Sequence, residues 1–355
     1  MPVIYNRNLF VSRWLKVSFF CLGIILLISD LPALGKKGKS NLGSASGQAT
    51  VSLWSFPADI GNRNLFFGAG GRQDQPRGTF EFVKEDLDGS SPKFYVRDQD
   101  GTKWKVKLGP EARPETAATR LIWAAGYGAD EDYFVPLLQV SGMPAHLHRG
   151  QAWIGPGGAV HDARLKRYSK GRKKVGRWNW KTNPFSGTRE LDGLRVMMAL
   201  VNNWDLKNDN NSIYKDSLSG SSKDGRNLIY LVSDVGASFG AGGRSWTLAK
   251  SKDNLKAYGR SKFLGEDGSS YISFDDPQKP PFLFFFNLPE FILRKQVQWV
   301  CSHIPRAHAQ WIGQVLAQLS PGQIRDAFRA GGYSPDEIES YAKIVEERIS
   351  ELNDL

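Results

Sequence analysis

Cysteine and long apolar runs are both scarce in this sequence of 355 residues. Two cysteines are too few for a disulfide-dense scaffold or for a zinc site built from several thiolates. The apolar run near the N-terminus covers about 13 residues, short of the ~20 that cross a bilayer comfortably. Charged residues make up 23% and hydrophobic residues 41% of the chain, a globular balance that excludes wholesale disorder, collagen and a coiled coil.

Basic residues exceed acidic residues, 47 Lys and Arg against 36 Asp and Glu, which gives a formal net charge of +11. This excess favours anionic partners such as phosphates, lipid headgroups or other polyanions, and it says nothing about the fold. The length is sufficient for one large domain or two modest ones.

The N-terminal segment, residues 1–35, predicts a secretory signal peptide. Three basic residues precede the apolar run at 17–29, and the small residues at 33–35 suit a cleavage site. An uncleaved N-terminal membrane anchor is the alternative. Either outcome places the rest of the chain outside the cytoplasm, in the periplasm or secreted, because the positive flank stays inside. Residues 36–55 are rich in Gly and Ser at their start and predict a flexible linker.

Antiparallel strands are expected next. Five runs have strand-like composition, and the first three follow one another closely across turns of Asp, Gly, Ser and Pro: 80–83, 94–96, 104–108, 133–140 and 159–168. A helix is expected at 114–125, between the third and fourth strands, with Pro114 at its first position.

The second half has mainly helical spacing. Helices are expected at 190–202, 307–319, 321–330 and from Pro335 onward, where Ser334 and Glu337 form a capping box. A polar loop precedes a strand-like run at 228–232. The apolar run at 280–293 is interrupted by prolines, so we interpret it as core.

The pattern Asp205-Leu206-Lys207-x-x-Asn210 indicates phosphoryl transfer. At this spacing the Asp can orient the attacking hydroxyl, the Lys can neutralise the transferring phosphoryl group, and the Asn can hold Mg²⁺. Asp234, followed by Gly236 after the strand-like run, can offer a second carboxylate to the metal.

An upstream pair completes the pattern. Lys107 ends the third expected strand and can contact nucleotide phosphates, and Glu115 on the following helix can hold that Lys in place. Because only eight residues separate the two, Glu111 is a rival partner for Lys107.

In the order of these motifs the chain resembles the protein-kinase-like superfamily, including its atypical HipA-like, CotH-like and phosphatidylinositol-kinase-like branches. The resemblance implies a two-lobed α+β fold, with a small antiparallel-sheet N-lobe carrying one helix at 56–140 and a larger helical C-lobe at 141–355. It also implies ATP or another nucleotide with Mg²⁺ or Mn²⁺ in the cleft, and an unknown protein or small-molecule acceptor.

The resemblance assigns a role to each residue of the motifs. Lys107 and Glu115 correspond to the phosphate-binding pair, Asp205 to the catalytic Asp and Lys207 to the phosphoryl-neutralising Lys. The metal ligands correspond to Asn210 and Asp234.

Two departures from the kinase pattern stand out. No glycine-rich G-x-G-x-x-G loop joins the first two strands; the turn contains Ser90 and Ser91, as in the short Ser-containing loops of the atypical branches, and these serines are candidate nucleotide contacts. Asn203-Trp204 replaces the usual His-Arg, so activation by loop phosphorylation through that Arg is not expected.

The segment 164–181 is strongly basic: nine of its eighteen residues are Lys or Arg, and none is acidic. It predicts a surface for anionic lipid or another polyanion, or else a solvated loop. Nucleic acid is not an expected partner of an exported protein. The alternative to an enzyme is therefore a catalytically inactive pseudokinase scaffold that binds an anionic surface through this segment.

Overall fold

Five strands of the N-terminal part close into a barrel in the computed structural model, which describes residues 50–168, 171–216, 227–242, 251–275, 283–286 and 288–355. The strand order is β2-β3-β4-β6-β5, and all neighbours are antiparallel except the β2–β5 pair that closes the barrel. The bounds are β2 Phe80–Asp86, β3 Lys93–Asp98, β4 Lys103–Leu108, β5 Asp132–Ser141 and β6 Ala159–Arg167.

Alternation along these strands separates an apolar interior from a polar exterior. On β4, Trp104 and Val106 are buried in the barrel core with residues such as Phe94 and Leu165. Lys105 and Lys107 point to the opposite face, where Lys105 lies 2.6 Å from Asp86. The barrel wall therefore presents charged side chains outward while its interior remains apolar.

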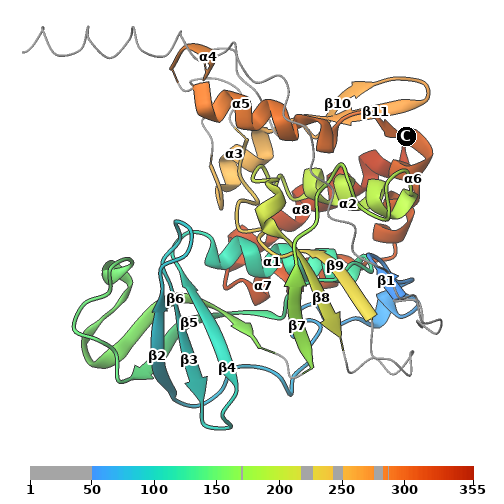
Figure 1. Ribbon diagram of the computed structural model, residues 1–355. Coiled ribbons are helices and arrows are strands. Elements are labelled where there is room, and N and C mark those ends of the chain that lie inside the picture. Colours follow the sequence, from blue (N-terminus) through green and yellow to red (C-terminus); the bar gives the residue numbers. More distant parts are fainter. Residues whose placement is uncertain (1–49, 169–170, 217–226, 243–250, 276–282, 287) are drawn as a thin grey trace, which may run out of the picture. The chain divides into compact units, whose positions relative to one another are not determined.

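Helix α1 (Ala112–Ala124) lies between the barrel and the helical part of the chain (Figure 1). It contacts β5 and β6 on one side and α7 on another. Its apolar residues belong to the large core of the helical part, while polar residues on the same helix, Glu115 among them, are buried as well. The whole helix is thus an internal element whose polar groups need partners.

The C-terminal part combines helices with two small sheets. One sheet has the order β1-β9-β8-β7 and the other β10-β11-β12. The strands are β1 Thr50–Ser52, β7 Arg172–Gly176, β8 Asn211–Asp216, β9 Asn227–Val232, β10 Leu264–Asp267, β11 Tyr271–Phe274 and β12 Ile304–Pro305. The α-helices are α2 Arg189–Leu200, α3 Leu255–Arg260, α4 Leu283–Phe286, α5 Leu288–Val297, α6 Arg306–Leu316, α7 Pro321–Ala330 and α8 Pro335–Asn353.

The expected α+β class is confirmed, with a sheet-rich N-lobe carrying one helix and a larger, mainly helical C-lobe. The capping box of the last helix is present, since Ser334 accepts from Glu337 N and the Glu337 side chain accepts from Ser334 N. The expected strands at 133–140, 159–168 and 228–232 and the helices at 190–202, 307–319 and 321–330 are all found, with their ends shifted by at most three residues.

Some expected boundaries are wrong. The helix after β4 starts at Ala112, two residues before Pro114, because Pro is tolerated anywhere in the first turn, where N–H groups have no helical partner. The N-lobe does not end at residue 140, because β6 completes the barrel. The linker does not extend to residue 55, because β1 pairs in parallel with β9. Residues 1–35 and 36–49 lie outside the described residues, so the signal peptide stays a prediction.

The interpretation of 280–293 as core is also wrong for the residues that the structure describes. Phe284, Phe285, Leu288 and Ile292 are all exposed, Phe285 to 79%. The apolar composition of this run therefore did not indicate burial. No helix within the described ranges is long and apolar enough to span a bilayer.

Arg348 of α8 ties the C-terminal helix to the end of α2. Its guanidinium is buried and donates to the carbonyl oxygens of Leu200 (2.9 Å) and Tyr258 (3.2 Å) and to Ser261 Oγ (2.9 Å). It also lies 4.0 Å from the centre of the Tyr258 ring. This contact holds the last turn of α2, from which the segment containing Asp205 departs.

We expect Arg348→Met to lower the free energy of unfolding by about 3 kcal/mol, because it removes several buried hydrogen bonds from one guanidinium together with its contact with the Tyr258 ring. The measurement is urea denaturation followed by circular dichroism. Lys343→Met is the matched control on the same helix, where the Lys343 side chain is 76% exposed. Equal effects of the two substitutions would contradict this account of Arg348.

Candidate functional site

Lys107 is a buried cation at the end of β4. Its Nζ lies 2.9 Å from Glu115 Oε2, 2.5 Å from Glu111 Oε2 and 3.1 Å from Asp234 Oδ1. Burial disfavours its charge, but these three carboxylates outweigh that cost and raise the pKa of Lys107 above its usual value. Lys107 is therefore a permanent positive charge held by residues from three separate segments.

Glu115 is held by two cations, one on each carboxylate oxygen. Arg164 Nη2 lies 2.7 Å from Glu115 Oε1, while Lys107 contacts Oε2. Arg164 also contacts Asp132 Oδ1 at 3.2 Å. Burial raises the pKa of Asp132 to about 7, and Arg164 opposes that rise. The residues Lys107, Glu115, Arg164 and Asp132 thus form one buried network of alternating charge behind the outward face of the barrel.

Glu111 connects the β2–β3 turn to this network. Ser91 Oγ donates to Glu111 Oε2 at 3.1 Å, and Lys252 contacts the other oxygen. Gly236 packs against the same residue so closely that an added Cβ would lie 2.7 Å from Glu111 Cβ. Both rival partners of Lys107, Glu111 and Glu115, therefore contact it. Ser90 lies exposed in the turn.

The segment after α2 holds Asp205 in a network of local contacts. Asp205 Oδ1 lies 2.9 Å from Lys207 Nζ, and the Asp205 backbone oxygen accepts from Asn210 Nδ2 at 2.7 Å. Asn203 Oδ1 accepts from the Asp205 backbone N–H. The Asp205 side chain is 28% exposed, so it is positioned by the chain and still reached by solvent.

The β8–β9 hairpin brings Asn210 close to Asp234. Asn211 pairs with Val232 across the hairpin, and Ser233 N donates to the Asn210 backbone oxygen at 2.7 Å. Asn210 and Ser233, which flank the Asn211–Val232 pair, are therefore neighbours, and Asp234 follows directly after Ser233. Asp234 then contacts Lys107, so a continuous series of contacts runs from Asp205 through Asn210 and Ser233 to the barrel.

Two oxygen ligands are available for a divalent cation beside Lys107. The Asn210 side chain donates its amide N–H to the Asp205 backbone oxygen, so its amide oxygen can serve as a metal ligand. The second ligand is the carboxylate of Asp234, whose side chain is 43% exposed. Carboxylate and amide oxygens suit Mg²⁺ or Mn²⁺, which usually keep several waters and phosphate ligands. The donor set therefore fits such an ion. Among the described residues, no group of three His, Cys, Asp or Glu side chains could hold a metal.

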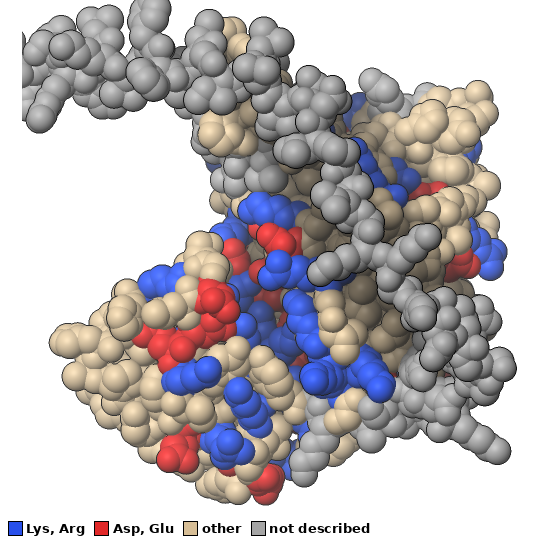
Figure 2. Space-filling model, viewed as in Figure 1, with Lys and Arg blue, Asp and Glu red and all other residues tan. Residues whose placement is uncertain are grey.

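Charged side chains crowd the hollow beside the barrel, where Lys and Arg alternate with Asp and Glu (Figure 2). Sequence reasoning did not assign Arg164, Lys252 or Asp132 to this site. Arg164 reaches the site because it pairs directly with Lys107 in the β4–β6 register and so lies on the same face, a long-range pairing that the sequence alone does not show.

The basic segment 164–181 is not one exposed surface. Arg164 is 5% exposed and paired with two carboxylates, and Lys166 contacts Asp130. Trp178 and Trp180 at its end are buried. The exposed basic residues begin at β7, and residues 169–170 lie outside the described part of the chain. An anionic-surface role for the segment stays a proposal.

No protein-family model matches the chain, and no curated protein matches it. Among solved structures, the chain is similar to the Helicobacter pylori proinflammatory kinase CtkA, with TM-score 0.42 and 11% identity over 78% of this chain and 97% of that chain. It is also similar to the Golgi casein kinase, with TM-score 0.31 and 12% identity over 83% of this chain and 78% of that one.

A second structure of the Golgi casein kinase, with Mn/ADP bound, gives TM-score 0.31 and 11% identity over 83% of this chain and 76% of that one. The two-lobed α+β fold is defined by the strand order of the barrel, by helix α1 and by the contacts of Lys107.

The contribution of the ionised Glu111 carboxylate to the free energy of unfolding should depend on pH. Burial opposes its ionisation, but Lys107 and Lys252 outweigh burial and lower its pKa from 4.5 to about 2. A carboxyl with a lowered pKa contributes stability that is complete above its unfolded pKa and is lost as the pH falls through the folded value. At pH 7 we expect Glu111→Gln to cost about 2–3 kcal/mol in the free energy of unfolding.

The difference between wild type and Glu111→Gln should narrow as the pH falls from about 5 to about 3, measured by urea denaturation at each pH. Glu347→Gln is the control, because the Glu347 side chain is 59% exposed. A difference that stays constant over this range would mean that the carboxylate charge of Glu111 does not stabilise the fold.

Proposed function

We propose that the chain is a kinase-like phosphotransferase of an atypical branch, which binds a nucleotide and Mg²⁺ or Mn²⁺ beside Lys107. The observation that carries this proposal is the meeting of Lys107 with Glu115 at 2.9 Å and with Asp234 at 3.1 Å. A buried Lys is costly unless it is paired. A site with a cation braced by a helix and next to a partly exposed carboxylate is suited to a phosphate–metal group.

Each residue has a distinct part in the proposed reaction. Lys107 binds phosphate oxygens, and Asn210 and Asp234 would hold the divalent cation, which supplies positive charge to those oxygens. Asp205 accepts the proton of the acceptor hydroxyl, and Lys207, 2.9 Å from it, stabilises negative charge on the transferring group. Positioning and electrostatics account for the catalysis, with no covalent enzyme intermediate.

The β2–β3 turn supports an atypical branch within this proposal. It has no glycine-rich loop, and Ser91 of the turn contacts Glu111, which in turn contacts Lys107. The turn is therefore coupled to the phosphate-binding Lys by side chains. The competing pseudokinase scaffold has less support, because part of its basic segment is buried in ion pairs.

Nucleotide binding should raise the thermal stability of the full chain. With Mg²⁺ or Mn²⁺ present, ATP at about 100 times its Kd should add about 2.7 kcal/mol to the free energy of unfolding. Asp234→Ala should abolish most of this gain, whereas Asp100→Ala in the exposed β3–β4 turn should retain it. Calorimetry on the three proteins measures the effect, and no gain in wild type would contradict the proposal.

Asp205→Asn should separate catalysis from binding. Loss of the carboxylate removes the proton acceptor, so release of inorganic phosphate from ATP, with water as acceptor, should fall by about 10²–10⁴-fold. The ATP-dependent thermal shift should persist, because Asp205 does not hold the nucleotide. Phosphate release is measured with a coupled spectrophotometric assay. A wild-type rate in Asp205→Asn would show that Asp205 is not the proton acceptor.

A further inference from the structure

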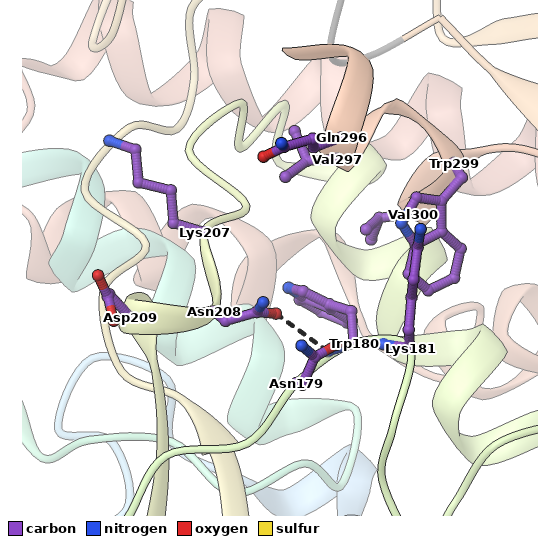
Figure 3. Close-up of a pocket in the computed structure, with 10 residues that line it drawn as sticks. All are labelled: Asn179, Trp180, Lys181, Lys207, Asn208, Asp209, Gln296, Val297, Trp299 and Val300. Carbon is purple, nitrogen blue, oxygen red and sulfur yellow. Dashed lines mark hydrogen bonds between the residues drawn. The ribbon is translucent and has the colours of Figure 1, made fainter. Parts of the chain in front are cut away.

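A cavity of about 550 Å³ lies beside Lys207, outside the network around Lys107. Its walls come from three segments, residues 179–181, 207–209 and 296–300 (Figure 3). The middle segment belongs to the loop that holds Asp205. Lys207 lines the cavity, and its ammonium lies 2.9 Å from Asp205, so this one side chain connects the cavity wall with the proposed proton acceptor.

Trp180 has a buried donor that lacks a partner within the described residues. Its side chain is 2% exposed, and its indole Nε1–H makes no hydrogen bond there. The neighbouring Trp178, whose ring centre lies 4.7 Å away, donates its own Nε1–H to the Leu231 carbonyl. A buried donor without a partner is costly, so the Trp180 N–H marks a place for an acceptor atom from a ligand.

The backbone of Trp180 is held by the loop that carries Asp205. Its backbone N–H donates to Asn208 Oδ1 at 3.1 Å, the bond drawn as a dashed line in Figure 3. In that view the indole nitrogen faces the space between Lys207, Asn208 and Val297. The buried indole N–H therefore lies in the cavity wall, which the loop carrying Asp205 helps to hold.

Lys181 gives the cavity a positive charge. The other two charged residues that line it are paired with residues outside it, Lys207 with Asp205 at 2.9 Å and Asp209 with Arg177 at 2.8 Å. The Lys181 ammonium lies 5.7 Å from the centre of the Trp299 ring, so an apolar face adjoins the cation. Amide side chains complete the lining, with both donors and acceptors suited to hydroxyl groups.

We propose that this cavity binds the acceptor, and that the acceptor is a small hydroxylated molecule with a carboxylate or phosphate group. The acidic group accepts a hydrogen bond from the Trp180 indole N–H and forms an ion pair with Lys181, and its carbon skeleton packs against the face of the Trp299 ring. The volume is in the range typical of small-molecule sites. This inference rests on the proposed phosphotransferase function and names its substrate class.

The proposed reaction transfers the γ-phosphoryl group of the nucleoside triphosphate to the acceptor hydroxyl. The acceptor hydroxyl loses its proton to Asp205 as its oxygen forms a bond to the γ-phosphorus of the nucleoside triphosphate. The bond from that phosphorus to the bridging oxygen breaks, and the nucleoside diphosphate leaves with the electron pair. The product is the phosphate ester of the acidic acceptor.

Binding of matched acid and neutral probes to the full chain tests the proposal. The acids are D-glucuronate and glycerol 3-phosphate, and their neutral counterparts are D-glucose and glycerol. In titration calorimetry up to about 10 mM, at least one acid should saturate and its neutral counterpart should bind at least about 10-fold more weakly. If neither acid saturates, if the neutral probes bind equally well, or if an acidic peptide alone binds, the proposal is overturned.

Two variants locate the binding. Trp180→Phe keeps the aromatic packing and removes the N–H, so acid affinity should fall by about 10-fold while the melting temperature of the free protein is unchanged or higher. Lys181→Gln should weaken the acids more than the neutral probes. Trp153→Phe, in the N-lobe, and the exposed Lys343→Gln are the controls. A lower melting temperature for Trp180→Phe with unchanged acid affinity would give Trp180 a structural role and overturn the site.

The nucleotide experiment distinguishes the two proposals. An ATP-dependent thermal shift without acid binding overturns the cavity inference alone. Acid binding without any nucleotide shift overturns the acceptor role together with the proposed function.

Discussion

A single buried ammonium group determines how three segments of this chain meet. Lys107 contacts carboxylates on α1, on the loop before it and on the segment after β9. Breaking a buried ion pair leaves an uncompensated charge, which is far more costly than never having placed the pair there. The barrel, the internal helix and the β8–β9 hairpin are therefore adjusted to one another by electrostatics as well as by apolar packing.

Helix α1 transmits that constraint to the rest of the molecule. Its apolar side chains belong to the core of the helical part, and its Glu115 belongs to the charge network of the barrel wall. A shift of the helix would disturb both. Arg164, the second cation that contacts Glu115, still neutralises the charge of this carboxylate if Lys107 turns toward a phosphate. The network can thus exchange one partner for a ligand without leaving a buried charge unpaired.

The loop after α2 has contacts in two directions. Through Asn210 and Ser233 it is joined to the segment that carries Asp234, and through Asn208 it braces Trp180 of the neighbouring cavity. Lys207 lies between these two sides and contacts Asp205. A donor site beside Lys107 and an acceptor site beside Trp180 would therefore share one short loop, which is the geometry that transfer between two bound molecules requires.

Local pattern was sufficient for the α+β class and for most helices and strands, because strand alternation and capping are short-range properties. It offered Glu115 and Glu111 as rival partners of Lys107, and the structure shows that both contact it. The boundary of the N-lobe needed more, since β6 closes the barrel only through long-range pairing with β4 and β5. The apolar run at 280–293 misled for the same reason: composition indicates a tendency to be buried, but Phe284 and Phe285 remain exposed even though their rings contact each other.

The sequence by itself determined which residue types could perform phosphoryl transfer and in what order they occur along the chain. The tertiary structure alone decided that Glu111 and Glu115 both contact Lys107, that Arg164 and Lys252 join the same network, and that the indole of Trp180 lies in the wall of a cavity next to Lys207. Charge pairing and hydrogen bonding act between atoms a few ångströms apart in space. Their partners here are separated by up to 141 positions, so no local pattern records them.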